Sequence, residues 1–373
     1  MKIGFLSVFY PFRGGIAQFN ANLFREFEKK HEIKAWNFTR QYPEILFPGK
    51  SQFVAENDTA DAIPSQRTLD TINPLTWYKT ATAVKKFAPD VLFTRLWMPF
   101  FSPSLGTVAA SVRKKGTKTI ALLDNVLPHE RRPGDHALIR YYLKRHDGFI
   151  VMTESVKSDL QTFLPNAKIL LKPHPIYSHF GESVPIAKAR TALGLPTDKK
   201  IILFFGFIRG YKGLDILIEA MKNLPEDYHL LIAGEVYGDY SPYENLIEKF
   251  KLNSRVHQFV EYIEDEKVPL LFSAADLCVL PYRSATQSGI AQIAWHYHLP
   301  LLVSQVGGLA EMVDEGETGL ILDELNATAL AKKIMLYYEN NLKDQFSINM
   351  EKQRDQYSWP GFTDAMIDFV KKI

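Results

Sequence analysis

Two cations stand in a glycine-rich loop of the second half of the chain. In "FFGFIRGYKGLDILIEAM", residues 204–221, Arg209 and Lys212 lie between an apolar run and an amphipathic helical pattern. The glycines allow sharp turns and a close approach of the backbone to a ligand. The start of the following helix presents free N–H groups and the positive end of its dipole. Because arginine can donate to two oxygens at once, the loop predicts a diphosphate site. A solvated basic loop is the alternative.

Two further loops have the same character. The segment 281–300, "PYRSATQSGIAQIAWHYHLP", again leads from an apolar run into a helical pattern. Its small polar turn suits N–H contacts with phosphate and consists of Thr286, Gln287, Ser288 and Gly289. The third loop, "YPFRGGIAQF" at 10–19, contains Gly14 and Gly15. Three such loops favour a shared ligand cleft over packing alone.

The elements that must position these loops alternate between strands and helices. Each half contains short apolar runs with helical patterns between them, such as the pattern at 73–87. The predicted strands are 2–9, 90–95, 119–124 and 148–153 in the first half, and 200–206, 228–234, 255–260, 275–282, 299–304 and 318–323 in the second. Alternation of this kind predicts an α/β fold with parallel sheets covered on both faces. Polar residues 40–70 are expected to form a long loop near a site.

The chain length and a change in composition suggest two domains. The 373 residues are enough for two, and residues 173–196 contain four prolines without sustained periodicity. We therefore expect Rossmann-like domains at 1–175 and 197–357, facing each other across a cleft, with a linker at 176–196. A C-terminal helix at about 358–373 can pack back on the first domain.

Charge is unevenly distributed along the chain. Residues 1–180 hold 25 Lys and Arg against 15 Asp and Glu, a balance of +10, and the remainder has a balance of −8. The basic half is expected to face an anionic partner, either a membrane surface, a phosphorylated acceptor or a nucleic acid. Because no recognition motif accompanies the charge, nucleic acid is disfavoured.

Apolar runs in the sequence bear on location. No run approaches the ~20 residues of a membrane span. The N-terminus does not resemble a signal peptide, since its apolar run is short and ends in Pro11 and Arg13. A cytoplasmic protein is therefore expected, which could be peripheral at the inner face of a membrane. The single cysteine, Cys278, is expected to be a buried core thiol.

One basic segment invites two interpretations. In "HERRPGDHALIRYYLKRHD", residues 129–147, Arg140 and Lys144 share a helical face. The same helix has apolar side chains at Leu138, Ile139, Tyr142 and Leu143. It could rest on an anionic membrane that carries a lipid-linked acceptor. It could equally be an ordinary surface helix with its apolar side in the core.

Metal and cofactor signals are weak. The chain has no closely spaced His and Cys set and no D-x-D motif, so metal-independent chemistry without a cofactor is expected. His296 and His298 are two residues apart and point to different sides of a helix. A dehydrogenase is disfavoured because residues 4–15 do not spell G-x-G-x-x-G.

Six motifs together resemble the retaining glycosyltransferases of family 4, which have the GT-B fold of two Rossmann-like domains. The resemblance covers nearly the whole chain. The motifs are "GGIAQFNANLFREF" at 14–27, "DNVLPHE" at 124–130, "FGFIRGYKGLDILIEA" at 205–220, "AGEVYGDY" at 233–240, "LPYRSATQSGIAQIAWHYHLP" at 280–300 and "VGGLAEMV" at 306–313. Each is modest alone, but their order and spacing are specific.

The resemblance implies roles for matching residues. Arg209 and Lys212 would neutralise the departing diphosphate of a nucleotide sugar. The backbone at Gly14 and Gly15 would approach that phosphate and the transferred sugar. The turn at 286–289 would hold phosphate or sugar oxygens. The nucleoside pocket would be lined by the loop after Gly234, including Glu235, and by the strand end near Tyr262 and Ile263.

The chain departs from the family pattern at two places. Two glutamates that the family usually carries correspond to Ala285 and Ile293. Thr286, Gln287 and Gln292 are the candidates to bind the sugar and ribose in their place. Where many members have a histidine at the end of the strand near residue 123, this chain has Asp124. The imidazole could come from His129, and either residue could orient the acceptor.

The function implied is transfer of a sugar from a nucleotide-diphosphate sugar to a glycan or lipid-linked acceptor, as in polysaccharide biosynthesis, with retention of configuration. Two alternatives remain open on the same fold. One is a nucleotide-sugar epimerase or a sugar phosphorylase. The other is a non-catalytic domain that binds a nucleotide, which the replaced glutamates favour.

Overall fold

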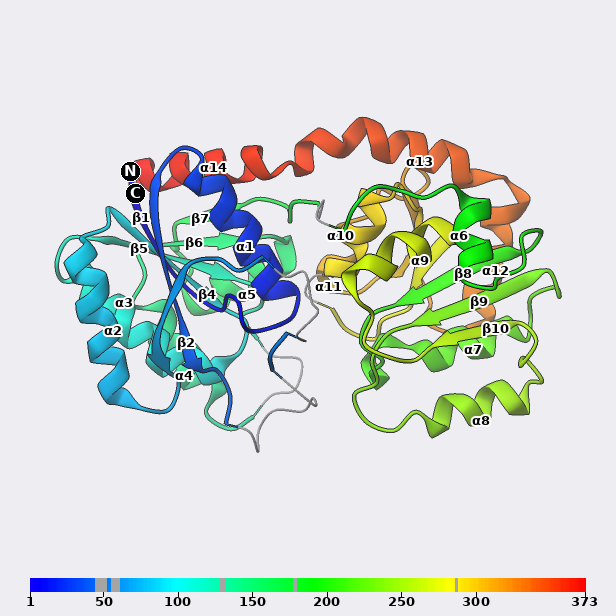
Figure 1. The fold of residues 1–373 in the computed structure, drawn as a ribbon, viewed down its shortest axis with the longest axis horizontal. Coiled ribbons are helices and arrows are strands. Elements are labelled where there is room, and N and C mark those ends of the chain that lie inside the picture. The colour runs from blue at the N-terminus through cyan, green and yellow to red at the C-terminus, as the bar shows by residue number, and fades with distance from the viewer. Residues whose placement is uncertain (44–51, 55–60, 128–131, 177–179, 286–287) are drawn as a thin grey trace. The chain divides into compact units, whose positions relative to one another are not determined.

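The chain forms two compact units. The computed structural model describes residues 1–43, 52–54, 61–127, 132–176, 180–285 and 288–373. The first unit comprises Met1–Pro175 together with Tyr357–Ile373, and the second comprises Ile176–Gln356 (Figure 1). Each unit contains a parallel sheet with helices on its faces, so the predicted α/β class is confirmed.

The first unit contains a seven-stranded parallel sheet. Its order is β3-β2-β1-β4-β5-β6-β7. The strands are β1 (Lys2–Leu6), β2 (Glu32–Arg40), β3 (Ser65–Asp70), β4 (Val91–Leu96), β5 (Lys118–Leu123), β6 (Gly148–Val151) and β7 (Ile169–Leu171). All six residues of β4 are buried, as expected for a central parallel strand covered on both faces.

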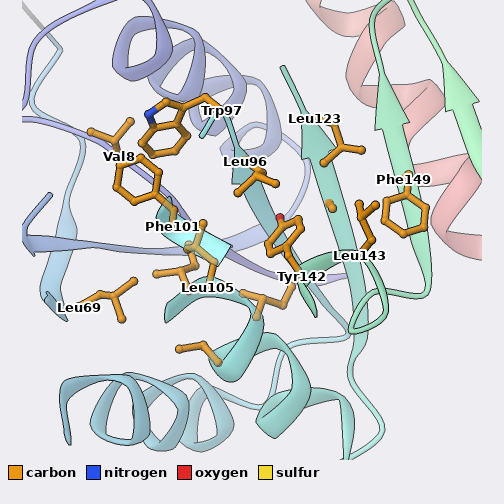
Figure 2. Packing of buried hydrophobic residues seen from close by; sticks show 14 of the residues in the cluster. Val8, Leu69, Leu96, Trp97, Phe101, Leu105, Leu123, Tyr142, Leu143 and Phe149 are labelled. Atoms are coloured by element: carbon orange, nitrogen blue, oxygen red, sulfur yellow. The ribbon is translucent and has the colours of Figure 1, made fainter. Parts of the chain in front are cut away.

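Helices cover this sheet on both sides. They are α1 (Gly15–Glu28), α2 (Pro74–Phe87), η2 (Pro99–Phe101), α3 (Ser102–Arg113), α4 (Asp135–Leu143), α5 (Glu154–Phe163) and α14 (Trp359–Lys372). Helices α2 to α5 contribute to one core cluster, where Trp97, Phe101 and Tyr142 lie among aliphatic side chains of the sheet (Figure 2). Helix α1 packs against α14, which brings the C-terminal segment onto the first unit.

The second unit contains a six-stranded parallel sheet in the order β10-β9-β8-β11-β12-β13. Its strands are β8 (Lys200–Phe205), β9 (Tyr228–Ala233), β10 (Val256–Phe259), β11 (Leu277–Leu280), β12 (Leu301–Ser304) and β13 (Gly319–Leu322). Its helices are α6 (Ile186–Ala192), η3 (Gly210–Lys212), α7 (Leu214–Met221), α8 (Ser241–Lys249), η4 (Asp265–Lys267), α9 (Val268–Ala274), α10 (Gly289–His296), α11 (Gly307–Ala310), α12 (Ala327–Glu339) and α13 (Leu342–Gln353), and η5 (Arg354–Tyr357) follows.

Two segments differ from the sequence expectations. The predicted loop at 40–70 contains strand β3, whose polar sequence SQRTLD reflects its place at the edge of the sheet. The predicted linker at 176–196 contains helix α6, which buries Ala189 and Arg190. Arg190 donates to Asp276 at 2.8 Å, so this segment is anchored in the second unit.

Helix α4 is an ordinary surface helix. Ile139, Tyr142 and Leu143 are buried in the core of the first unit, while Arg140 and Lys144 are exposed. Of the two interpretations of this segment, the structure supports the one without apolar surface for a membrane. Within the described part of the chain, no helix has the length and apolar character needed to cross a bilayer.

Candidate functional site

The carboxyl edge of the second sheet brings two glycine turns together. Strand β8 ends before Gly206 and β9 ends before Gly234, which adopt φ values of 99° and 150°. A Cβ atom at Gly234 would lie 2.1 Å from the carbonyl oxygen of Gly206, so the two turns can touch only with glycine there. The Ile208 N–H donates to the Glu235 carbonyl at 2.8 Å and links the loops.

Lys212 is a buried cation at this edge. Its side chain belongs to η3 and is 7% exposed. Among the described residues, none forms a hydrogen bond or an ion pair with its ammonium group, which lies 5.1 Å from the centroid of the Tyr282 ring. Burial and the nearby charge of Arg209 lower the pKa of Lys212 to about 8. A buried ammonium group without an anionic partner is suited to receive an anionic ligand.

The ammonium group of Lys212 faces the first glycine turn. A Cβ atom at Gly206 would lie 3.2 Å from the Lys212 Nζ atom. Arg209 is half-buried, and its guanidinium lies 5.2 Å from the centroid of the Tyr237 ring, in the loop after β9. The predicted pair of cations therefore lies beside the backbone of both turns.

An ion pair holds the cation-bearing turn in place. The side chain of Arg283 donates to both carboxylate oxygens of Asp215, at 2.9 and 2.6 Å, and to the Gly210 carbonyl at 2.5 Å. The Arg283 N–H donates to the Tyr211 carbonyl at 2.7 Å. These contacts join the loop after β11 to η3 and to the first turn of α7. Neither Arg283 nor Asp215 was predicted as a site residue, although Arg283 stands in the quoted "PYRSATQSG" segment.

The loop after β11 contributes the start of α10. Ser288 caps this helix, because its Oγ accepts a hydrogen bond from the Ala291 N–H at 3.4 Å, and Gly289 is the first helical residue. Thr286 and Gln287 lie outside the described residues. Gln292 is fully buried, and its Nε2 atom lies 3.9 Å from the sulfur of Met312.

The remaining predicted residues of this unit lie at neighbouring strand ends. Glu235 follows β9 and is half-buried, and Ile263 follows β10 and is 9% exposed. The positions that carry glutamates in the family are both apolar and buried, with Ala285 at 9% and Ile293 at 6% exposure. The carboxyl edge thus assembles cations and glycine turns but lacks those two carboxylates.

Gly14 and Asp124 lie at the carboxyl edge of the first sheet. Gly14 has a φ of 110° and precedes α1, which begins at Gly15 and has no side-chain cap. Asp124 follows β5 and is buried. Its two carboxylate oxygens accept hydrogen bonds from Nε and Nη2 of Arg95, at 2.7 and 2.5 Å. His129 lies outside the described residues.

Arg95 connects Asp124 to helix α1. Its Nη1 donates to the Asn20 Oδ1 atom at 3.0 Å, and its guanidinium lies 4.1 Å from the centroid of the Phe19 ring. Arg95 is 2% exposed, so the ion pair with Asp124 is buried. Asp124 is therefore a neutralised carboxylate held in one orientation. Sequence reasoning missed Arg95 because 29 residues separate the pair.

Cys278 and His174 both lie in structural surroundings. Cys278 is fully buried, and burial raises the pKa of its thiol, as expected for a core residue. His174 is buried against Phe19, and burial lowers its pKa to about 3. No three His, Cys, Asp or Glu residues within the described ranges gather where they could hold a metal ion. Metal independence stays a prediction.

The chain is similar in sequence to known glycosyltransferases. Residues 185–355 match the family described as "Glycosyl transferases group 1". A D-inositol 3-phosphate glycosyltransferase of Xylanimonas cellulosilytica is 26% identical over 68% of this chain and 58% of its own length. A second, from Mycolicibacterium smegmatis, is 30% identical over 48% of this chain and 42% of its own. The alignments thus span roughly half of these relatives.

Solved structures share the whole fold at low sequence identity. The sucrose-phosphate synthase of Thermosynechococcus elongatus superposes with a TM-score of 0.75 at 20% identity, over 100% of this chain and 98% of its own. Anabaena HepE, solved in complex with UDP, superposes with a TM-score of 0.79 at 15% identity over the full length of both chains. Residues 185–355 are therefore similar to the glycosyl transferases group 1 family, in a chain with the two Rossmann-like domains of the GT-B fold.

Proposed function

We propose that this protein is a retaining glycosyltransferase of family 4 that takes its sugar from a nucleotide-diphosphate sugar. The observation that carries the proposal is Lys212, a buried ammonium group without an anionic partner among the described residues, beside Arg209 and the Gly206 turn. A diphosphate would supply the missing negative charge. The match of residues 185–355 to glycosyl transferases group 1 supports the same assignment.

The cations would act on the leaving group. As the bond between sugar and diphosphate breaks, negative charge develops on the diphosphate oxygens, and donors fixed in advance stabilise it without reorganisation. Loss of one such contact costs about 2.7–4 kcal/mol in comparable sites. With retention, the acceptor would attack from the face that the diphosphate leaves, and a diphosphate oxygen would help to take the acceptor proton.

Asp124 would orient the acceptor or the sugar hydroxyls rather than accept a proton. Arg95 occupies both of its oxygens, so the charge of the carboxylate is already neutralised. A role in orienting the acceptor or the sugar hydroxyls is compatible with this geometry. The approach of Gly14 and Gly15 to the sugar and the contribution of His129 stay predictions from the sequence.

The names of similar proteins suggest the first substrates to test. HepE has been solved with UDP and with UDP-glucose, so UDP-sugars are the first donors. The curated relatives named after D-inositol 3-phosphate add that compound to the glycan and lipid-linked acceptors. A lipid-linked acceptor would bring the protein to the inner face of a membrane.

A non-catalytic nucleotide-binding protein is the second candidate. It is favoured by the buried apolar residues Ala285 and Ile293 at the two positions where the family usually has glutamates. Such a protein would bind the nucleotide through the same cations but would transfer nothing.

A thermal-shift screen followed by a transfer assay separates these candidates. UDP-, GDP- and ADP-sugars are added to the protein, and a donor that binds the folded state raises its Tm. The donor that does so is then incubated with glycan, lipid-linked and inositol phosphate acceptors, and product is measured by mass spectrometry. Transfer by the native protein and its loss in Lys212→Ala support the proposal. Conversion of the donor without any acceptor would indicate an epimerase, and no stabilising donor would contradict nucleotide-sugar binding.

A further inference from the structure

Helix α2 has an exposed apolar surface at its start. Ile72 is 48% exposed, Leu75 is 79% exposed and Tyr78 is 60% exposed. Three large apolar side chains thus face solvent within seven residues. The opposite side of the helix packs into the first unit through Thr80, Ala81 and Val84. The exposure therefore belongs to an amphipathic helix with one buried side and one exposed side.

The exposed apolar residues share their helix face with lysines. Leu75, Tyr78, Lys79 and Lys86 are spaced i, i+3, i+4 and i+11, which places them along one side of an α-helix. All four are exposed. This surface, formed by Ile72, Leu75, Tyr78, Lys79 and Lys86, is named here the α2 face.

Charge around the α2 face is predominantly positive, and Asp70, whose Oδ1 atom accepts a hydrogen bond from the Ile72 N–H, is paired with Arg40. From Thr71 to Leu123 the sequence contains eight Lys and Arg but a single acid, Asp90. Helix α3 packs beside α2 and ends in a basic run (Figure 1). The cations of the two helices and the turn after α3 are Lys79, Lys85, Lys86, Arg113, Lys114 and Lys115. Arg113 pairs with Asp147, and the others leave a net positive surface.

We infer that the α2 face docks the protein on an anionic lipid bilayer. Exposed leucine, isoleucine and tyrosine side chains can enter the interface between head groups and acyl chains, and lysines on the same helix attract anionic head groups. A second copy of this chain would bring like charges together at a symmetric contact, which disfavours self-association through the same face. The inference does not depend on the proposed transferase activity, because it concerns a surface of the first unit and is tested by binding alone.

Vesicle binding tests the inference. The full chain is mixed with vesicles of phosphatidylcholine alone or of phosphatidylcholine with phosphatidylglycerol, and bound protein is measured by co-sedimentation at several salt concentrations. We expect binding only to the anionic vesicles. Lys79→Glu with Lys86→Glu should weaken it by about 25-fold or more, since each basic residue contributes about a fivefold factor. Leu75→Ser with Tyr78→Ser should also weaken binding and leave its salt dependence in place.

Matched variants in the second unit control for charge and for apolar exposure. Lys332→Glu with Lys352→Glu makes the same charge change on α12 and α13, and Leu336→Ser with Ile348→Ser replaces exposed apolar side chains there. Both pairs should bind vesicles like the native protein. Circular dichroism confirms that each variant is folded.

Several results would overturn the inference. They are no binding to anionic vesicles, unchanged binding by both α2 pairs, or an equal loss in the control pairs. A loss confined to Arg140→Glu with Lys144→Glu would move the contact to helix α4. A change in oligomeric state with the α2 variants, measured by light scattering, would show that the face joins two copies of the chain.

Discussion

Lys212 is the central residue of the candidate site in the second unit. Its ammonium group is buried beside the Gly206 turn, and the described residues provide no counter-charge. Native proteins seldom bury an unpaired charge, because desolvation is costly. When the unliganded protein nevertheless keeps a buried charge at this desolvation cost, a bound ligand typically supplies the opposite charge.

The free energy of unfolding should reveal this cost. Because the pKa of Lys212 is lowered from 10.5 to about 8, burial of its charged form costs roughly 3 kcal/mol below pH 8. Lys212→Met should therefore stabilise the unliganded protein at pH 7 by roughly 1–3 kcal/mol, measured by urea unfolding.

The lowered pKa of Lys212 also makes the stability of the native protein depend on pH. Between about pH 8 and 10.5 the unfolded state holds the proton that folded Lys212 has lost, so the native protein gains stability as pH rises. The advantage of Lys212→Met should shrink over this range. A variant that is less stable than the native protein at pH 7 would show that Lys212 is satisfied in the unliganded state.

The sequence predicted those site residues that lie close to one another along the chain. Arg209, Lys212 and the glycines lie in one short segment, so spacing alone predicted their proximity. It could not predict that Arg95 neutralises Asp124, because the two residues meet only when β4 and β5 pair. It also named Gln292 as a donor-binding residue. Helix α10 buries that side chain, and its role stays a prediction.

The 3₁₀ turn η3 depends on contacts from a distant loop. Arg283 fixes this turn through the Gly210 carbonyl and fixes α7 through Asp215. The glycine between them, Gly213, has a φ of 70° and lies against the Pro281 carbonyl, so the turn and the loop after β11 fit closely.

Arg283→Ala should weaken nucleotide binding more than it weakens folding. Its ion pair with Asp215 is partly exposed and worth about 0.2–1 kcal/mol to stability, so Tm should change little. Without Arg283, η3 is no longer held in place, so Arg209 and Lys212 are no longer fixed in position before the ligand binds. The affinity for the nucleotide diphosphate should therefore fall by about tenfold. Calorimetric titration measures the affinity.

Lys222→Ala is the matched control, since it removes the Lys222–Glu219 ion pair on the same helix. It should leave affinity unchanged. Equal losses in both variants would show that general loosening of α7, not the contact to η3, controls binding.

Element prediction failed where the usual signals are weak. Strand β3 is polar because it lies at the sheet edge, and β7 has only three residues. Helix α6 is a seven-residue helix between prolines. The central strands β1, β4 and β5 and amphipathic helices such as 73–87 were predicted from their apolar runs and their periodicity. The nine-residue strand β2, which lies inside the sheet, was missed because polar residues interrupt its apolar run.

The C-terminal helix completes the first unit. Phe19 of α1 is fully buried and contacts Trp359 and Phe362 of α14, with ring centroids 5.0 and 5.9 Å apart. It also packs against His174, near the end of the main segment of this unit. One aromatic side chain thus joins three parts of the chain.

Phe19→Ala should loosen this junction. Removal of a buried phenylalanine costs about 3–5 kcal/mol. Hydrogen exchange of peptides covering α1 and α14 should accelerate, while peptides from the second unit should exchange as in the native protein. Leu336→Ala, at an exposed position of α12, should change neither. Faster exchange in both units would mean that the first unit does not unfold on its own.

Binding of a diphosphate by Lys212 and Arg209 at the carboxyl edge of the second sheet can be measured directly. Calorimetric titration of the native protein and of Lys212→Met with UDP and UMP tests it, using the base that the thermal screen selects if this is not uracil. We expect the native protein to prefer the diphosphate, and Lys212→Met to lose about a hundredfold in affinity for it while its affinity for the monophosphate changes little. Equal diphosphate affinity in the two proteins would show that Lys212 does not bind the diphosphate.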